Sequence, residues 1–373
     1  MSRGPALRTA TAVATLTLLA GCSDGPAADS GAGPGPASSS APPDATGSPT
    51  GSPTGGPTGS STGSSTGSTR NATPTADPAD ELPPVRDAVS LPALMREKLR
   101  GGTVRRERRQ LTTDAYARYE VTYPSGDLRV SGVLLVPTGK GPFPAVVLNH
   151  GYIEPSIYVT GQGLSREQDY LARAGFVVLH TDYRGHAASD AASPLSRETR
   201  LGYTRDTINA VQSLKKETYV DADRVAMLGR SMGGGVTLNA LVAKPDLVKA
   251  GVVFASVSSR FLDNFDRWTR AERPDAAAAF FDEFGTPRQE PGFYRDLSAR
   301  TYFDRITAPV LMHHGTLDDS CPIAWSGTTL GLLRSAGVRS RLDVYEGEQH
   351  AFGPQWPESM RRTVAFLRRE LRA

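Results

Sequence analysis

A serine, an aspartate and a histidine stand where they could together carry out nucleophilic acyl transfer. Ser231 lies in the turn Gly229-Arg230-Ser231-Met232-Gly233, and Asp318 and His350 each lie in a loop directly after a predicted strand. A serine hydroxyl is a weak nucleophile unless a base takes its proton and a third group orients that base. We therefore predict an acyl-enzyme on Ser231, with His350 as the base and an aspartate as the group that orients it.

The surroundings of Ser231 distinguish it from two other matches to the same pattern. G-x-S-x-G also occurs at residues 59–63 and 63–67, inside a low-complexity stretch. Only the third match follows a strand-like run, residues 224–228, and precedes an apolar helical segment, residues 236–242. A tight strand-to-helix turn exposes the serine hydroxyl, and glycines two residues before and after it prevent collisions. The N-terminus of the following helix also favours negative charge.

The base can be chosen among six histidines, whereas the acid remains open between two residues. His350 alone follows the last predicted strand, while the other histidines close strands or belong to other loops. Asp318 and Asp319 both follow the strand at residues 310–312 and compete for the role of acid. A zinc site on the adjacent His313 and His314 is not expected, because neighbouring side chains of a strand point apart. We predict no metal and no cofactor.

Two backbone N–H groups are expected to bind the oxyanion of the tetrahedral intermediate. One belongs to Met232, the residue after the nucleophile, and the other to the loop that begins Asn149-His150-Gly151-Tyr152. Gly151 allows a close backbone approach, so the Tyr152 N–H is the expected donor, with the Tyr152 hydroxyl as the alternative. Arg230 is expected to form a solvent-facing salt bridge, with contact to an anionic substrate as the alternative.

The order of the elements predicts an α/β fold with a mostly parallel central sheet. Residues 119–123 and 128–136 alternate like antiparallel strands around a turn. Continuous apolar runs then alternate with segments of helical period, which is typical of parallel strands buried on both faces and covered by helices on both sides. The apolar runs are residues 145–148, 176–179, 225–228, 252–254 and 310–312, and the helical segments are residues 164–173, 198–216, 236–242, 323–335 and a last one from Trp356.

Residues 257–305 interrupt this alternation. They contain no clear strand and are dense in aromatic residues. We predict a helical cap over the carboxyl edge of the sheet, where ligands bind in open α/β folds. A peripheral helical pair that packs only on itself is the alternative.

The N-terminal residues predict export and a lipid anchor. Residues 1–21 have a positive start and an apolar run too short to span a bilayer, as in a signal peptide. Leu19-Ala20-Gly21-Cys22 resembles the lipobox of bacterial lipoproteins, which implies that Cys22 becomes the lipid-modified first residue; a chance cysteine is the alternative. Residues 22–80, rich in Ser, Thr, Gly, Pro and Ala, predict a disordered tether.

Composition limits the partners of the remaining residues, 82–373, which are expected to form one catalytic domain. The formal net charge of +3 gives no reason to expect nucleic acid. The basic run around Arg105, Arg106, Arg108 and Arg109 is interpreted as a solvated face, with contact to anionic lipid as the alternative. Cys321 has no partner once Cys22 carries lipid, so no internal disulfide is expected. The oligomeric state is not predicted.

Several motifs together resemble the α/β-hydrolase superfamily. Within it, the chain is similar to the catalytic domain of prolyl oligopeptidase-type serine peptidases and to dienelactone-hydrolase-like esterases. The matching pieces are His150-Gly151, Asp182-Tyr183-Arg184-Gly185-His186, residues 220–235, and His314-Gly315-Thr316-x-Asp318-Asp319 with His350. The resemblance extends from about residue 115 to the C-terminus. It implies the chain order Ser, Asp, His and favours Asp318 as the acid.

These observations predict an exported, lipid-anchored serine hydrolase that acts on a short peptide or a small ester at the outer face of the cell membrane. A peptidase is the first expectation, a carboxylesterase the alternative, and a non-catalytic surface binding module a distant third. Full-length members of the peptidase family carry a β-propeller before the catalytic domain. Here a predicted tether occupies that place, which strengthens the esterase alternative.

Overall fold

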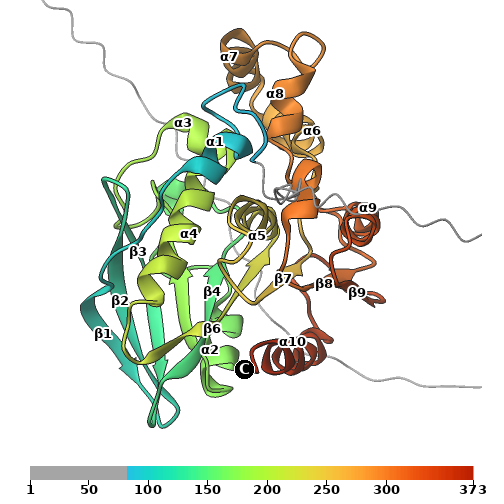
Figure 1. Ribbon diagram of the computed structural model, residues 1–373. Helices are drawn as coiled ribbons and strands as arrows, with labels where there is room; N and C mark the ends of the chain where they lie inside the picture. The colour runs from blue at the N-terminus through green and yellow to red at the C-terminus, as the bar shows by residue number, and fades with distance from the viewer. Residues whose placement is uncertain (1–81, 373) are drawn as a thin grey trace, which may run out of the picture. The chain divides into compact units, whose positions relative to one another are not determined.

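A single nine-stranded sheet runs through residues 82–372, which are the residues that the computed structural model describes (Figure 1). Its strands lie in the order β1-β2-β3-β5-β4-β6-β7-β8-β9. The first three are antiparallel and the other six are mutually parallel, with β3 and β5 antiparallel at the junction. The strands are β1 Arg105–Thr112, β2 Tyr116–Ser125, β3 Leu128–Pro137, β4 Phe143–Asn149, β5 Val177–Thr181, β6 Val220–Arg230, β7 Ala250–Phe254, β8 Val310–Gly315 and β9 Ser340–Tyr345.

Burial explains which strands the sequence predicts well. All residues of β5, β7 and β8 are buried, as expected of apolar parallel strands covered on both faces. Strand β1 was not predicted, because all eight of its residues are exposed and its basic residues show no alternation. It is a strand because its backbone pairs with β2, with Arg105 opposite Thr122 and Thr112 opposite Ala117.

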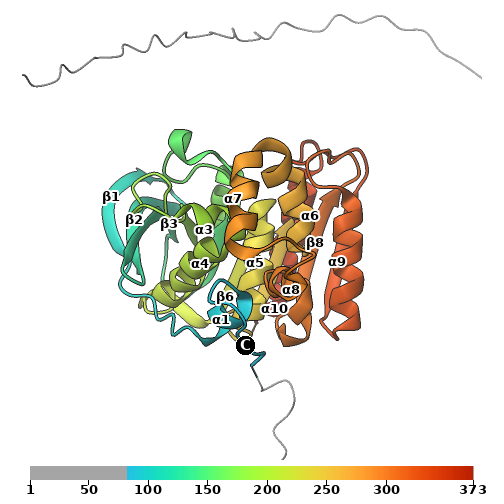
Figure 2. The same cartoon turned by 90° about the horizontal axis from the view of Figure 1, so that it is seen from above.

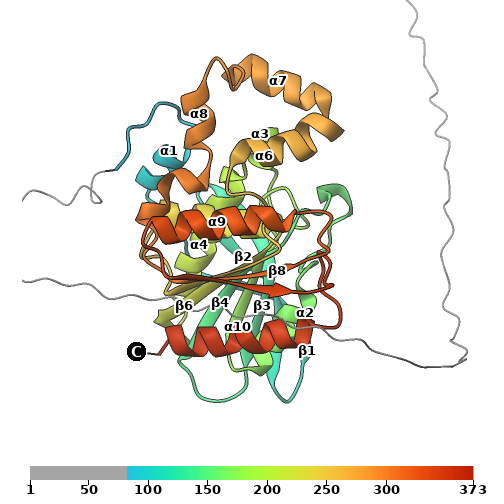
Figure 3. The ribbon, with the colours of Figure 1, turned by 90° about the vertical axis from the view of Figure 1, so that its right-hand side faces the viewer.

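Helices cover both faces of the sheet, which confirms the predicted α/β-hydrolase architecture (Figures 2 and 3). One core contains residues of α1, α4, α5 and α9, and the other contains residues of α2 and α10. The helices are α1 Leu91–Arg96, α2 Ser165–Arg173, α3 Pro194–Thr199, α4 Leu201–Leu214, α5 Met232–Ala243, α9 Ile323–Ser335 and α10 Trp356–Glu370, with a short helical turn η2 at Pro155–Ile157. None of the helices within residues 82–372 is both long and apolar enough to cross a membrane.

The predicted helix at residues 198–216 is divided in two. Helix α3 ends at Thr199 and α4 begins at Leu201, because Arg200 between them has a left-handed backbone with φ 62° and ψ 4°. Position 200 is neither glycine nor proline, so the sequence does not predict that the helix ends there.

The segment between β7 and β8 is helical and lies beyond α5 and α9, on the side of the sheet away from α10 (Figure 3). Most of its aromatic rings pack on one another; the rings of Phe284 and Phe293, for example, stack with centroids 4.7 Å apart. Its elements are α6 Phe261–Asn264, η3 Phe265–Arg270, α7 Pro274–Phe284, α8 Pro291–Asp296 and η4 Ala299–Arg305. The predicted signal peptide, Cys22 and the tether lie outside the described residues.

Candidate active site

Ser231 stands in a strained turn between β6 and α5. Its backbone has φ 56° and ψ −122°, a conformation that an L-residue adopts only when the surroundings enforce it. A Cβ on Gly229 would lie 2.1 Å from the Gly233 carbonyl oxygen, and one on Gly233 would lie 1.9 Å from the carbonyl oxygen of Asn149. Both glycines are therefore required by close backbone contacts, as the predicted strand-to-helix turn demands.

The loop after β4 lies directly against the serine. Strands β4 and β6 are parallel neighbours, with Asn149 opposite Gly229, so the two loops that follow them meet. A Cβ on Gly151 would lie 3.2 Å from Ser231 Cβ and 3.8 Å from Ser231 Oγ. Within residues 82–372, neither the Tyr152 N–H nor the Met232 N–H donates a hydrogen bond to another part of the chain. Both remain available to a ligand at Ser231.

The Tyr152 hydroxyl is already occupied. It donates a hydrogen bond to Glu154 Oε2 and accepts one from Arg197. Burial, reinforced by the bond to Glu154, raises the pKa of Tyr152 to about 12, so the hydroxyl stays protonated at neutral pH. Of the two Tyr152 donors that the sequence leaves open, the backbone N–H is the free one.

Two loops at the carboxyl ends of β8 and β9 bring Asp318 and His350 together. Gly315 makes this approach possible, because a Cβ there would lie 2.1 Å from the Glu348 carbonyl oxygen, which also accepts from the Leu317 N–H at 3.0 Å. His350 Nδ1 lies 3.0 and 2.9 Å from the two carboxylate oxygens of Asp318. Asp318 is buried, whereas the competing Asp319 is exposed.

Asp318 has more hydrogen-bond donors than a single histidine supplies. The backbone N–H groups of Ser320 and Cys321 donate to Oδ1 at 3.0 and 2.8 Å, and His314 Nε2 lies 3.1 Å from Oδ2. Burial alone would raise the pKa of Asp318, but the hydrogen bonds from His314, His350 and the Cys321 N–H outweigh it and hold the pKa well below its usual range. Asp318 is therefore ionised and suited to stabilise an imidazolium on His350.

His314 is a neighbour of the site that the sequence interpretation did not select. Its buried ring also contacts Ser326 Oγ at Nδ1 and the Cys321 carbonyl oxygen at Nε2, at 2.7 and 2.8 Å. Both partners of Nε2 are acceptors, so this nitrogen carries the proton. His313, on the opposite side of β8, contacts Tyr345 and Thr363 instead. The four-residue spacing between His314 and Asp318 across a tight turn was the signal that could have found it.

A cavity of about 260 Å³ lies between the serine turn and the helical segment at residues 257–305. Ser231 and His350 both line it. No hydrogen bond joins them within the described residues, which is common for catalytic pairs without substrate. The remaining lining from the sheet side includes Tyr152, Met232 and Ser320, and the helical segment contributes Asn264, Phe265, Trp268, Thr269, Glu272 and Arg273.

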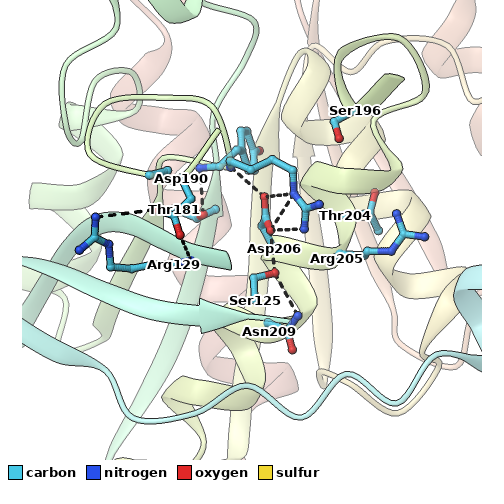
Figure 4. Close-up of polar contacts among 12 residues, drawn as sticks. Ser125, Arg129, Thr181, Asp190, Ser196, Thr204, Arg205, Asp206 and Asn209 are labelled. Carbon is cyan, nitrogen blue, oxygen red and sulfur yellow. Dashed lines mark hydrogen bonds and ion pairs between the residues drawn. The ribbon is translucent and has the colours of Figure 1, made fainter. Parts of the chain in front are cut away.

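The Asp182–His186 motif supports the loop at Gly151 from behind. Asp206, which is fully buried in α4, accepts a hydrogen bond from Ser125 Oγ at 2.7 Å (Figure 4). It also accepts hydrogen bonds from Arg184 N and Nη2, each at 2.8 Å. This pairing fixes the loop after β5. Tyr183 in that loop donates through its hydroxyl to the His150 carbonyl oxygen at 3.3 Å. The motif therefore positions backbone and does not face the cavity.

Arg230 differs from the expectation of a solvent-facing salt bridge. Its side chain is 13% exposed and pairs with Glu167, which is 1% exposed. Glu167 also accepts a hydrogen bond from Trp356 Nε1 at 2.7 Å. Arg230 thus ties the serine turn to α2 and α10, and it points away from the cavity that a substrate would enter.

Solved structures share this fold at low sequence identity. The acetyl xylan esterase from Paenibacillus sp. R4 superposes with a TM-score of 0.56 at 21% identity, over 74% of this chain and 92% of that chain. The acylaminoacyl peptidase of Pyrococcus horikoshii superposes with a TM-score of 0.54 at 22% identity, over 69% of this chain and 42% of that chain.

Several proteins that are similar in sequence are peptidases. The acylamino-acid-releasing enzyme of Mus musculus is 27% identical over 256 residues, which cover 66% of this chain but only 34% of that enzyme. The uncharacterized peptidase YtmA of Bacillus subtilis is 27% identical over 238 residues, 64% of this chain and 87% of that protein. The model of the prolyl oligopeptidase family matches residues 162–373, more than half of the chain. The chain belongs to the prolyl oligopeptidase family and is a serine hydrolase.

Proposed function

We propose that the protein is an exported, lipid-anchored serine peptidase that cleaves short peptides through an acyl-enzyme on Ser231. In this reaction Ser231 Oγ attacks the scissile carbonyl while His350 takes the hydroxyl proton, and Asp318 orients the imidazole and stabilises its charged form. The N–H groups of Met232 and Tyr152 bind the oxyanion. His350 then protonates the leaving amine, and water releases the acyl group.

The contact of His350 Nδ1 with both oxygens of Asp318, in a cavity that His350 shares with Ser231, carries this proposal. The bond fixes the ring so that Nε2 is left for the serine proton. The cavity volume, about 260 Å³, is below the roughly 300–1,000 Å³ of typical ligand sites, which supports short substrates.

Labelling with a fluorophosphonate probe tests the nucleophile. The wild-type protein is expected to be labelled and Ser231→Ala is not, while His350→Ala should slow labelling by several orders of magnitude. Equal labelling of wild type and Ser231→Ala would remove Ser231 from the mechanism. Absence of labelling in a folded wild-type protein would favour a non-catalytic binding module.

A substrate panel separates the peptidase from the esterase. Aminoacyl p-nitroanilides and p-nitrophenyl acyl esters require the same nucleophile, so the amide-to-ester ratio of kcat/KM distinguishes them. Cleavage of anilides and unblocked short peptides is expected. Hydrolysis of the esters alone would replace the peptidase assignment by that of an acyl esterase.

The lipid anchor is supported by the sequence Leu19-Ala20-Gly21-Cys22 and is tested separately from catalysis. Expressed in a bacterium that processes lipoproteins, the full chain is expected in the membrane fraction, and Cys22→Ala is expected to be released in active form. Equal membrane retention of both proteins would contradict the anchor without affecting the role of Ser231.

A further inference from the structure

Arg200 has a left-handed backbone conformation at the junction of two helices. It is the C-cap of α3 and the N-cap of α4, with φ 62° and ψ 4°. The left-handed region is unfavourable for an arginine, which has neither the freedom of glycine nor the short polar side chain of asparagine. Such outliers persist where the surroundings impose them, and they cluster at functional sites.

The side chain of Arg200 reaches the cavity that contains the serine. Arg200 lines this cavity together with Ser231 and His350. Its Nη1 lies 3.9 Å from the position that a Cβ on Gly235 would take, in the first turn of α5. Its Cζ lies 5.9 Å from the ring centroid of Trp268. The guanidinium therefore stands between the helix that follows the nucleophile and the helical segment above it.

Within residues 82–372, the Arg200 guanidinium has no ion pair and donates no hydrogen bond to another side chain or carbonyl. The other two arginines of the cavity differ in this respect. Arg197 pairs with Glu154, and Arg273 pairs with Glu198, whose carboxylate also accepts from Thr269 Oγ1 at 2.8 Å. The nearby carboxylate of Glu198 is thus already committed to other donors.

Arg200 is partly buried, and its guanidinium faces the cavity without an acceptor from the described chain, so a ligand in the cavity can supply one. Burial lowers the pKa of Arg200 to about 10, so the group remains charged at neutral pH. A partly desolvated charge gains more from an oppositely charged acceptor than a fully solvated charge does. Glu272 also lines the cavity without an ion pair in the described residues, but it is exposed to solvent, which screens its charge.

The larger cavity is where a substrate can reach this guanidinium. On its other side Arg200 borders a second cavity of about 20 Å³, next to Ser258 and Asn264. That space is large enough for one water molecule and too small for a substrate group. Any substrate group that meets Arg200 must therefore lie in the cavity that holds Ser231.

We propose that Arg200 determines specificity by binding a carboxylate of the substrate, so that the enzyme prefers acidic peptides. This inference rests on the proposed function of Ser231. A carboxylate accepts two parallel hydrogen bonds from the guanidinium fork and neutralises its charge. A neutral carbonyl accepts fewer bonds and leaves the charge uncompensated, so it gains less from the same site.

Two fluorophosphonate probes that differ only at the end of a short tail, one a carboxylate and one a carboxamide, test the proposal. Because both react with Ser231, their rate constants compare the two groups without a choice of substrate. In the wild-type protein the carboxylate probe is expected to react at least about tenfold faster. Arg200→Asn, which tolerates the left-handed backbone, is expected to abolish the difference by slowing only the carboxylate probe. Arg200→Lys should keep part of it.

Arg270→Gln provides the matched control, because Arg270 pairs with Asp266 in the same helical segment at 3.2 Å and does not line the cavity. It removes the same charge and should leave the preference intact. Equal rates of the two probes in the wild type, or an equal loss of both rates in Arg200→Asn with the fold retained, would overturn the role of Arg200 while Ser231 stays the nucleophile. If neither probe labels the folded wild type, the proposed function itself fails.

Discussion

At the scale of single residues, the acid of the site is held by two imidazoles. His350 approaches Asp318 from the loop after β9, and His314 approaches it from the end of β8. The exposed part of His350 faces the cavity, whereas His314 is fully buried and bonded at both nitrogens. His314 therefore acts through Asp318: it fixes the carboxylate and keeps it ionised while the charge on His350 changes.

Replacing His314 tests this positioning role. His314→Ala removes a donor to a carboxylate, so we expect kcat/KM to fall by about tenfold or more and the pKa of Asp318 to rise. His314→Gln can still donate to Asp318 and should recover most of the loss. The measurements are kcat/KM as a function of pH and the melting temperature, with the exposed Asp319→Asn as the control. A loss in both His314 variants that follows the melting temperature alone would indicate a purely structural role.

At the scale of elements, the serine turn depends on how closely α5 approaches β4. No side chain fits at Gly233, because the Asn149 carbonyl oxygen is 1.9 Å from the position of a Cβ. Backbone atoms cannot yield as a flexible side chain does. The position of α5, and with it the orientation of Ser231, is therefore fixed by backbone contact.

Gly233→Ala is expected to lower the free energy of unfolding by about 3 kcal/mol or more, or to prevent folding. Gly331→Ala in α9 is the matched control, since a Cβ there meets no atom within 4 Å. Alanine is the better helix former, so this control should gain about 0.5–1 kcal/mol. Urea unfolding measures both changes. A Gly233→Ala protein of normal stability would show that the helix can shift.

The buried pair of Asp206 and Arg184 links α4 to the loop after β5. Asp206→Asn leaves the largely buried guanidinium without its counter-charge, which typically costs about 3–5 kcal/mol. Asp266→Asn breaks the ion pair with Arg270, whose two side chains are each 50% exposed, and should cost about 1 kcal/mol or less. If the two substitutions lowered the free energy of unfolding in urea by similar amounts, the buried pair would contribute no more to stability than the exposed one.

At the scale of the whole molecule, the sequence predicts the central sheet better than its edges and turns. Runs such as residues 145–148 and 252–254 are apolar because helices cover both faces of the strands. A continuous apolar run therefore predicts a buried parallel strand. Strand β1 is held by backbone pairing with β2 and by contacts between charged and polar side chains, such as Arg108 with Glu120, and Arg200 breaks the helix with a left-handed backbone. Neither feature is marked in the sequence by apolar alternation or by a glycine or proline.

The candidate site shows the same division. Ser231, Asp318 and His350 are predictable because each follows a strand, and parallel strands bring their carboxyl ends to one edge. His314 and Arg200 are not, because their significance depends on which groups lack or supply a hydrogen-bond partner. Arg230 was misjudged for the same reason, since its partner Glu167 lies 63 positions away in the chain.

Buried neutral histidines make the stability of the whole domain sensitive to acid. Burial lowers the pKa of both His150 and His313 to about 3 in the folded protein, with repulsion from His186 and from Arg341 added respectively. In the unfolded chain each titrates near 6.5. Between these values the unfolded state binds protons that the folded state does not. The two neutral histidines therefore contribute fully to the free energy of unfolding above about pH 6.5, and this contribution is lost as the pH falls from about 6.5 towards about 3.

We expect the free energy of unfolding in urea to fall by a few kcal/mol between about pH 7 and about pH 4.5, since each unit of pKa difference corresponds to about 1.4 kcal/mol. Asp318 adds to the loss only at lower pH, because its usual pKa is about 3.9. His313→Gln keeps hydrogen-bonding groups for Tyr345 and Thr363 but cannot be protonated in this range. The substitution should therefore make the free energy of unfolding less dependent on pH, by up to the equivalent of one bound proton. A slope that is flat in the wild type, or unchanged in His313→Gln, would contradict this assignment of the acid sensitivity to the buried imidazoles.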